Sequence, residues 1–214
     1  MDWAATFERE AERYRDGEAR LGDGTDERQR QLTRMGNAAW GAALCRLMQG
    51  EDAGEWLARA ADRWRESYAD APAGSWGRPI GAVKARVLAG DWDGAEDAAR
   101  WALGEGAAAS EAPIGRYAAA LACAVLGDWE AARINADAIR IRDDFPRDVG
   151  DALAMIAAED VVGYVEAVES VLESLETRDE YLEDVPVADT VLVLQALAGR
   201  RGMAAELESA LLPG

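Results

Sequence analysis

Histidine is absent from this sequence of 214 residues, and Lys84 is its only lysine. Histidine is the commonest general base and metal ligand in proteins, so its absence disfavours catalysts and metal centres that are built on imidazole. The two cysteines, Cys45 and Cys123, lie far apart in separate apolar runs. We expect both to be buried, free side chains and neither a disulfide nor a nucleophile.

Long apolar runs are missing as well, because no stretch approaches the roughly 18 uncharged apolar residues of a transmembrane helix. The N-terminal residues 1–12 contain three glutamates and lack the basic and apolar regions of a signal peptide. These two observations predict a cytoplasmic protein without a membrane-spanning segment.

Acidic residues outnumber basic residues by 41 to 23, which gives a net charge of −18 and an isoelectric point of about 4.4. Such a charge repels phosphate groups, so we expect binding neither to nucleic acid nor to anionic membranes. Two explanations of the acidity stay open. The even spread of the acids favours adaptation to high salt, and the alternative is recruitment of a basic partner.

Helical, alanine-rich runs alternate with short helix-breaking segments. Three of these segments are near-copies, at residues 50–52, 90–92 and 127–129, and two weaker ones lie at 158–160 and 199–201. This pattern predicts an all-α, right-handed array of about five helical hairpins without a β-sheet. The whole chain, 1–214, would form one domain: a capping helix and loop at 1–24, then hairpins at about 27–70, 78–104, 113–142, 147–177 and 186–212.

Two of the repeated segments, 88–95 and 126–132, resemble the centre of a tetratricopeptide repeat. Each has a Gly-Asp-Trp turn, and Ala95 and Ala132 follow their glycine by five residues. The resemblance extends over about 79–141, while Gly163 departs from it at the corresponding position of the fourth unit. It implies a short solenoid that binds a protein or peptide on its concave face, and it implies no chemistry.

The register of the repeats places three apolar side chains, Trp40, Ile80 and Tyr117, at equivalent positions on the first helices of successive hairpins. In a solenoid these helices line the groove, so the three side chains are candidates for contact with a partner. The alternative interpretation is that they are buried between repeats as part of the core.

The same helices carry polar residues that are unusual in so acidic a chain: Asn37, Arg46, Lys84, Arg86 and Arg116. Arg46, Lys84, Arg86 and Arg116 are therefore candidates for holding a ligand that bears a carboxylate, as some tetratricopeptide domains do. The alternative is that these basic side chains form ion pairs with neighbouring acids at the hairpin junctions.

Catalytic and cofactor motifs are missing. Clusters of acids surround Pro146 and precede Pro186, but neither has the spacing of a calcium loop, so we expect no metal site. There is no nucleophile elbow, phosphate loop or dinucleotide fingerprint, so we expect no cofactor and no enzyme activity.

These observations predict a non-catalytic scaffold or adaptor for a protein or peptide. The first alternative is an acidic inhibitor or immunity-type protein that blocks a basic toxin or enzyme, and the second is an enzyme that uses only carboxylates. A short solenoid also exposes an apolar end, so we expect a homodimer through the terminal repeat, with Leu207, Leu211 and Leu212 as the contact candidates.

Overall fold

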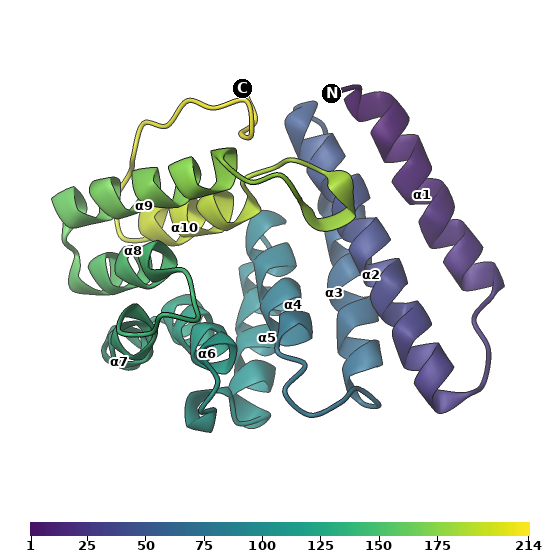
Figure 1. Ribbon diagram of the computed structural model, residues 1–214, viewed down its shortest axis with the longest axis horizontal. Helices are drawn as coiled ribbons and strands as arrows, with labels where there is room; N and C mark the ends of the chain where they lie inside the picture. Colours follow the sequence, from purple (N-terminus) through teal and green to yellow (C-terminus); the bar gives the residue numbers. More distant parts are fainter.

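The computed structural model describes residues 1–214 and contains ten α-helices, two short 3₁₀ turns and no strand (Figure 1). The all-helical prediction is confirmed. The helices are α1 (Trp3–Ala19), α2 (Thr25–Met48), α3 (Gly54–Tyr68), α4 (Gly77–Leu88), α5 (Trp92–Gly104), α6 (Pro113–Leu126), α7 (Trp129–Arg140), α8 (Arg147–Ala158), α9 (Val161–Glu176) and α10 (Asp189–Gly199); the 3₁₀ turns are η1 (Ala107–Ala109) and η2 (Leu182–Asp184). None of these helices combines the length and the apolar content that crossing a membrane requires.

The repeated turns end one helix and begin the next by the same local chemistry. Gly90 and Gly127 have φ angles of 67° and 75°, the left-handed conformation that closes a helix C-terminus. The aspartate that follows each glycine, Asp91 or Asp128, accepts a hydrogen bond from the backbone N–H three residues later, at 3.0 and 3.1 Å. This N-cap starts the next helix and explains why the motif recurs between helices.

Each helix from α1 to α9 packs against the next one along the chain. The pairs α2–α3, α4–α5, α6–α7 and α8–α9 occupy the ranges expected for the first four hairpins, and α1 covers α2. The arrangement curves, and the connection before α10 reaches back to the first helices, where η2 contacts α2 (Figure 1).

The prediction of a fifth hairpin at 186–212 is wrong in its second half, because no helix follows α10. Gly202, with φ 68°, ends the turn after α10, and residues 203–209 are extended rather than helical. Their burial alternates with period two, because Met203, Ala205 and Leu207 face the protein and the residues between them face solvent. The side-chain amide of Gln195 accepts from the Ala205 N–H at 3.4 Å and donates to its carbonyl at 2.6 Å, which holds this segment in place.

The remaining helix of that unit, α10, does not extend the array. It turns back and packs against α4, α8 and α9, on the inner side of the curve (Figure 1). Its sequence is apolar on almost every face, and Val191, Val193, Leu194, Leu197 and Ala198 are all buried. A helix without a polar face is stable only where protein surrounds it, which explains the inward position.

Two adjacent arginines hold the C-terminal end of α10. The Arg200 guanidinium lies 4.3 Å from the ring centre of Trp92, and that of Arg201 lies 4.2 Å from Trp129. Arg200 also donates to the Val125 carbonyl at 2.9 Å, at the end of α6. The two tryptophans of the repeated turns are therefore stacking surfaces for α10 as well as wedges between helices.

Trp64 of α3 fills the space between α2 and α4, and two glycines make this possible. A Cβ atom added at Gly36 or at Gly81 would lie 2.7 Å from the indole ring of Trp64. The indole N–H donates to the Asn37 side-chain oxygen at 3.0 Å, which fixes the ring between the two helices. Only residues without a side chain allow this close approach.

Replacing Gly36 with alanine is therefore expected to lower the free energy of unfolding. Overpacking a rigid core site costs about 1–3 kcal/mol. Alanine gains only roughly 1 kcal/mol over glycine in a helix interior. Urea denaturation followed by circular dichroism measures the net loss.

The matched control is Gly77→Ala, because a Cβ at Gly77 meets no atom within 4 Å. We expect this second variant to be at least as stable as the wild-type protein. A Gly36→Ala variant as stable as Gly77→Ala would contradict the packing argument.

Candidate functional site

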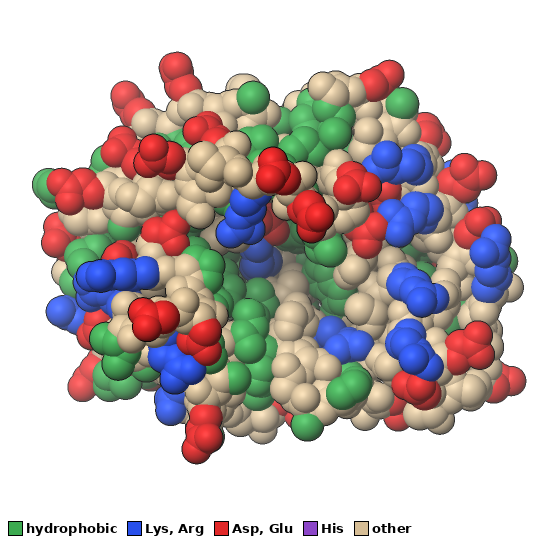
Figure 2. All heavy atoms as spheres, in the orientation of Figure 1, with side chains coloured by type: hydrophobic (Ala, Val, Ile, Leu, Met, Phe, Trp, Pro, Cys, Tyr) green, Lys and Arg blue, Asp and Glu red, His purple; other side chains and the backbone are tan.

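A pocket of about 370 Å³ opens on the inner side of the curved array, where α2, α4 and the segment before α10 meet. Figure 2 shows a hollow near the middle of this face, with basic side chains in it and acidic side chains above it. The pocket is lined by Thr33, Asn37, Trp40, Trp64, Gly74, Ser75, Trp76, Gly77, Arg78, Ile80, Gly81, Lys84, Leu182 and Asp189. Its size is that of a small-ligand or side-chain site.

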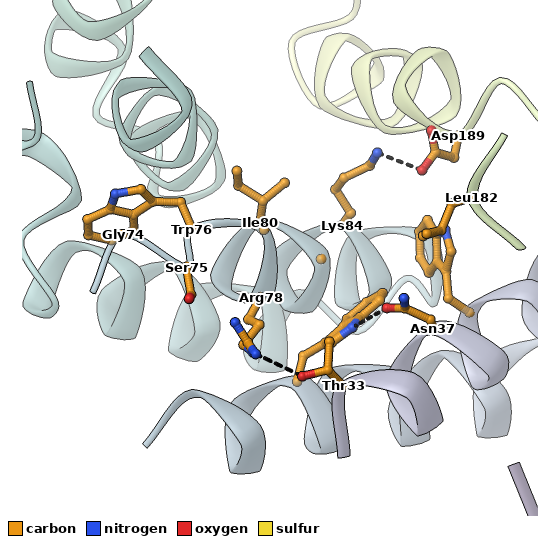
Figure 3. Close-up of a pocket in the computed structure, with 14 residues that line it drawn as sticks. Thr33, Asn37, Gly74, Ser75, Trp76, Arg78, Ile80, Lys84, Leu182 and Asp189 are labelled. Carbon is orange, nitrogen blue, oxygen red and sulfur yellow. Dashed lines mark hydrogen bonds and ion pairs between the residues drawn. The ribbon is translucent and has the colours of Figure 1, made fainter. Parts of the chain in front are cut away.

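Aromatic and aliphatic groups form most of the wall. Trp40 and Trp64 have their ring centres 5.7 Å apart and are tilted by 55°. Trp76, just before α4, and Ile80 of α4 also line the pocket (Figure 3). Leu182 of η2 covers one edge and is 51% exposed. An apolar side chain that entered the pocket would thus meet indole faces and be shielded from water.

An ion pair closes the end of the pocket next to α10. Lys84 Nζ lies 2.7 Å from Asp189 Oδ2 and 3.1 Å from Thr190 Oγ1, and 5.7 Å from the ring centre of Trp40 (Figure 3). Asp189 stands in the first turn of α10, where the helix dipole favours a carboxylate. The contact joins residues 105 positions apart in the chain.

Lys84 is a fixed cation in this environment. Burial lowers its pKa, but the charge and hydrogen bond of Asp189, together with the nearby Tyr117, outweigh burial, so the pKa lies above its ordinary value. A protonated ammonium group has no lone pair with which to attack a carbonyl carbon. The chemistry of Lys84 is therefore charge pairing.

Arg78 is the other cation of the pocket, and no acid neutralises it. Its Nε donates to Ser67 Oγ at 2.9 Å, and its Nη2 donates to Thr33 Oγ1 at 2.9 Å and to Gln29 Oε1 at 2.7 Å. All three acceptors are neutral. Burial lowers the pKa of Arg78, and no carboxylate raises it. An arginine stays protonated in proteins, so the pocket contains an uncompensated positive charge.

The segment 177–188, which connects α9 to α10, forms the edge of the pocket and is tied to α1. Glu183 pairs with Arg13, and its backbone carbonyl accepts from Arg9 Nη2 at 3.2 Å. Tyr181 Oη donates to the Leu175 carbonyl at 2.6 Å. Val185 and Val187 are buried beneath the segment. These contacts hold Leu182 and Asp189 at the pocket.

Four of the side chains singled out in the sequence meet at this pocket: Asn37, Trp40, Ile80 and Lys84. Trp40 and Ile80 are also largely buried, at 2% and 7% exposure, so each serves the core and the wall together. Tyr117 is not part of the wall. It is buried behind Lys84 and packs against Phe145, with ring centres 5.4 Å apart.

The structure places Arg46, Arg86 and Arg116 outside the pocket. Arg46 pairs with Glu51 and stacks on Phe7 at the end of α2. Arg86 bridges Asp62 of α3 and Asp91 of the turn between α4 and α5, at 2.6 and 3.0 Å. Arg116 donates to a backbone carbonyl of η1 and to an amide oxygen of α7. For Arg46 and Arg86 this matches the alternative of ion pairing at the hairpin junctions.

Sequence reasoning missed Arg78, although α4 contained a signal for it. This helix carries three basic residues, Arg78, Lys84 and Arg86, and no acidic residue at all. None of the three can find a partner three or four residues away on its own helix. Each must pair with another element, as Lys84 and Arg86 do, or remain without an acid, as Arg78 does.

Other reactive groups are not gathered into a site. No group of three or more Cys, Asp or Glu side chains is placed to hold a metal ion. Cys45 and Cys123 are buried and free, as expected from the sequence. Burial raises the pKa of each thiol from 9.0 to about 11, which suppresses the nucleophilic thiolate.

Comparison with known proteins adds no relative: no protein-family model, no curated protein and no solved structure matches this chain significantly.

Removing the charge of Asp189 is expected to destabilise the fold. Asp189→Asn leaves the Lys84 ammonium, which is 10% exposed, without an anion, and breaking a buried pair in this way costs about 3–5 kcal/mol. Lys84→Met should lower the free energy of unfolding by less, because Asp189 still interacts favourably with the dipole of α10 and its side chain is 23% exposed to water. The free energy of unfolding in urea measures both.

Glu55→Gln is the matched control, since Glu55 and Arg59 form an exposed pair worth less than about 1 kcal/mol. The raised pKa of Lys84 adds a pH test. The stabilisation that the protonated Lys84 gains from Asp189 is fully present below pH 10.5, the ordinary pKa of lysine. It is lost as the pH rises through the higher pKa of the folded state. The deficit of Asp189→Asn should therefore shrink in strong alkali, and equal losses for Asp189→Asn and Glu55→Gln would refute the assignment.

The two thiols are expected to be unreactive in the folded protein. A pKa raised by about two units lowers the thiolate fraction about 100-fold at pH 8, and burial blocks access further. Labelling by dithionitrobenzoate, compared between native and guanidinium-unfolded protein, tests this. Rapid labelling of the native protein would count against the burial of Cys45 and Cys123.

Proposed function

We propose that this protein is a non-catalytic scaffold that binds a segment of another protein or a peptide. In this proposal the helices form a right-handed α-α solenoid similar to tetratricopeptide-repeat domains. The segment is held on the inner, concave side. An apolar side chain of the segment enters the pocket between α2, α4 and the connecting segment 177–188.

One observation carries the proposal: the pocket joins three tryptophans to a net positive charge in a chain of net charge −18. Tryptophan and arginine are the residues that most often anchor protein interfaces. Protein cores are close-packed, so a cavity of this kind is not expected from core packing alone. Apolar surface that stays open to solvent is typical of an interaction site. A site shaped for a partner accounts for both features.

The lining of the pocket reduces the number of sequence candidates that are proposed to contact the partner. Trp40 and Ile80 supply apolar contact. Lys84 lines the pocket as well, and its ion pair with Asp189 holds its side chain in position. Tyr117 supports the wall from behind. Arg46 and Arg86 have acid partners of their own, so the proposal does not require them for the ligand.

The position of α10 sets the length of the segment that can bind. This helix packs against α4 and α8, where a peptide lying along the whole concave side would need to pass. The partner segment therefore reaches the pocket from the side of α2 and α3, and only a few of its residues make contact. Such short contacts are typical of transient adaptor interactions.

A second candidate function, an acidic inhibitor of a basic partner, is favoured by a different surface. A groove of about 500 Å³ between α9 and the extended C-terminal segment is lined by six glutamates: Glu166, Glu169, Glu173, Glu176, Glu206 and Glu208. A basic partner would be drawn to this groove, and its binding would weaken steeply with salt.

A homodimer through the terminal repeat stays a prediction. Leu207 lies on the extended segment 203–209, and Leu211 and Leu212 lie in the turn after it; all three are only partly buried against the core of their own chain. A second copy that covered them would bury the remainder of these side chains.

Selection from a random peptide library, displayed with both peptide ends blocked, tests the scaffold proposal. Recovered peptides should bind wild-type protein and lose about tenfold or more in affinity for Leu182→Glu, which places a charge at the edge of the pocket. Fluorescence polarisation of synthesised peptides gives the dissociation constants. Leu182 is half exposed, so the variant should fold.

The matched control is Ile141→Glu, which adds the same charge at an 84% exposed site at the end of α7. This variant should bind as the wild-type protein does. Peptides that bind Leu182→Glu undiminished would move the site away from the pocket. Steep salt dependence and a requirement for basic residues in the peptides would support the inhibitor instead.

A further inference from the structure

The structure assigns to Arg78 and Asn37 the recognition of an acidic side chain, Asp or Glu, that neighbours the apolar anchor of the bound segment. This inference rests on the proposed function and names the chemistry of the partner. It also identifies two specificity-determining residues, of which Arg78 was not a candidate from the sequence.

The first step is the charge that remains available in the pocket. The wall contains two cations, Lys84 and Arg78, and one anion, Asp189. Lys84 is already paired with Asp189 at 2.7 Å. Arg78 binds only hydroxyl and amide oxygens, so its positive charge is free to attract a ligand. A half-buried, unneutralised guanidinium binds a carboxylate strongly because little water competes.

The second step is the hydrogen-bonding capacity that the protein leaves unused. Thr33 Oγ1 accepts from Arg78 and donates to the Gln29 carbonyl at 2.8 Å, so it is fully engaged. Asn37 uses its oxygen to accept from the Trp64 indole, and its amide NH₂ has no partner in the protein. Arg78 Nη1 has no partner either. The free groups near Trp64 are therefore donors, and their ligand must be an acceptor.

The third step is the position of these donors relative to the apolar wall. Arg78, Gly81 and Lys84 follow one another at intervals of three residues, so Gly81 lies between the other two, which are about 9 Å apart along α4. Gly81 leaves the surface between them bare, and the Trp64 ring lies against it. Figure 3 shows Arg78 directed to the side of α4 where Thr33 and Asn37 lie, and Ile80 and Lys84 directed to the other side. A segment whose acid binds Arg78 can therefore pass over Gly81 and place a neighbouring apolar side chain toward Ile80.

A lone ion or a wholly apolar ligand fits less well. An ion would make no use of the apolar part of the wall at Ile80 and Leu182, and an apolar ligand would bury Arg78 Nη1 and the Asn37 NH₂ without acceptors. Leaving such donors unpaired costs about 1–3 kcal/mol for each group and more for a charged one. A segment with adjacent apolar and acidic side chains satisfies both halves of the wall.

The test repeats the blocked-end peptide selection in parallel on three proteins: wild type, Arg78→Glu and the control Arg34→Glu. Arg34 is an exposed arginine on α2, so its replacement makes the same change in net charge outside the pocket. Peptides from wild type and from Arg34→Glu should share an Asp or Glu beside an apolar residue. Arg78→Glu should lose this preference and select Lys or Arg at that place. Because both peptide ends are blocked, a terminal carboxylate cannot supply the acid.

Two further measurements sharpen the outcome. Changing the selected Glu to Gln in a synthesised peptide should weaken binding to wild type about tenfold or more, and should not weaken binding to Arg78→Gln. Thermal unfolding checks each variant, and Arg78→Gln replaces Arg78→Glu if the latter does not fold. Peptides that bind the pocket without an acid, or that keep their acid preference on the Arg78 variants, would overturn this inference while leaving the scaffold proposal intact. Failure to recover any peptide on wild type would overturn both.

Discussion

The return of α10 into the inner side of the helical array is the constraint on which the rest of the structure depends. A helix with apolar residues on nearly every face is unstable in water, so it must be enclosed by other elements. Its N-terminal end is fixed by the ion pair between Asp189 and Lys84, and its C-terminal end by Arg200 and Arg201 on the repeated-turn tryptophans. These contacts close a curved row of helices whose other contacts are mostly between neighbours in the chain.

The pocket is a consequence of that closure. Helices α2 and α4 supply its floor and walls, but the edge belongs to the segment 177–188, which is positioned because α10 is held on α4 and Glu183 is held by α1. The ion pair at Lys84 therefore has two roles: it anchors α10, and it neutralises one of the two cations in the pocket. What remains for a ligand is the single charge of Arg78 beside three tryptophans.

Part of the site could be read from the sequence, because the repeat register aligned Trp40, Ile80 and the helix that carries Lys84. The same helices also indicated Arg46, Arg86 and Tyr117 as candidates. In the structure the two arginines form ion pairs outside the pocket, and Tyr117 packs against Phe145. Spacing along one helix identifies which residues share a face, but it does not identify the acid that a long basic side chain reaches on another helix. The absence of acids from α4 was visible in the sequence and indicated partners at a distance, without naming them.

The sequence by itself determined the helices and their turns, because a left-handed glycine followed by a capping aspartate acts within a few residues, and because apolar periodicity defines the buried faces. The repeat pattern extended the last hairpin to residue 212, and the structure shows instead that residues 203–209 are not helical and alternate in burial with period two. Only the tertiary structure decided that α10 turns inward, that Lys84 meets Asp189 across 105 positions, and that Arg78 finds no acid. The physical reason is that charge pairing and enclosure depend on distances between elements, which local sequence does not encode.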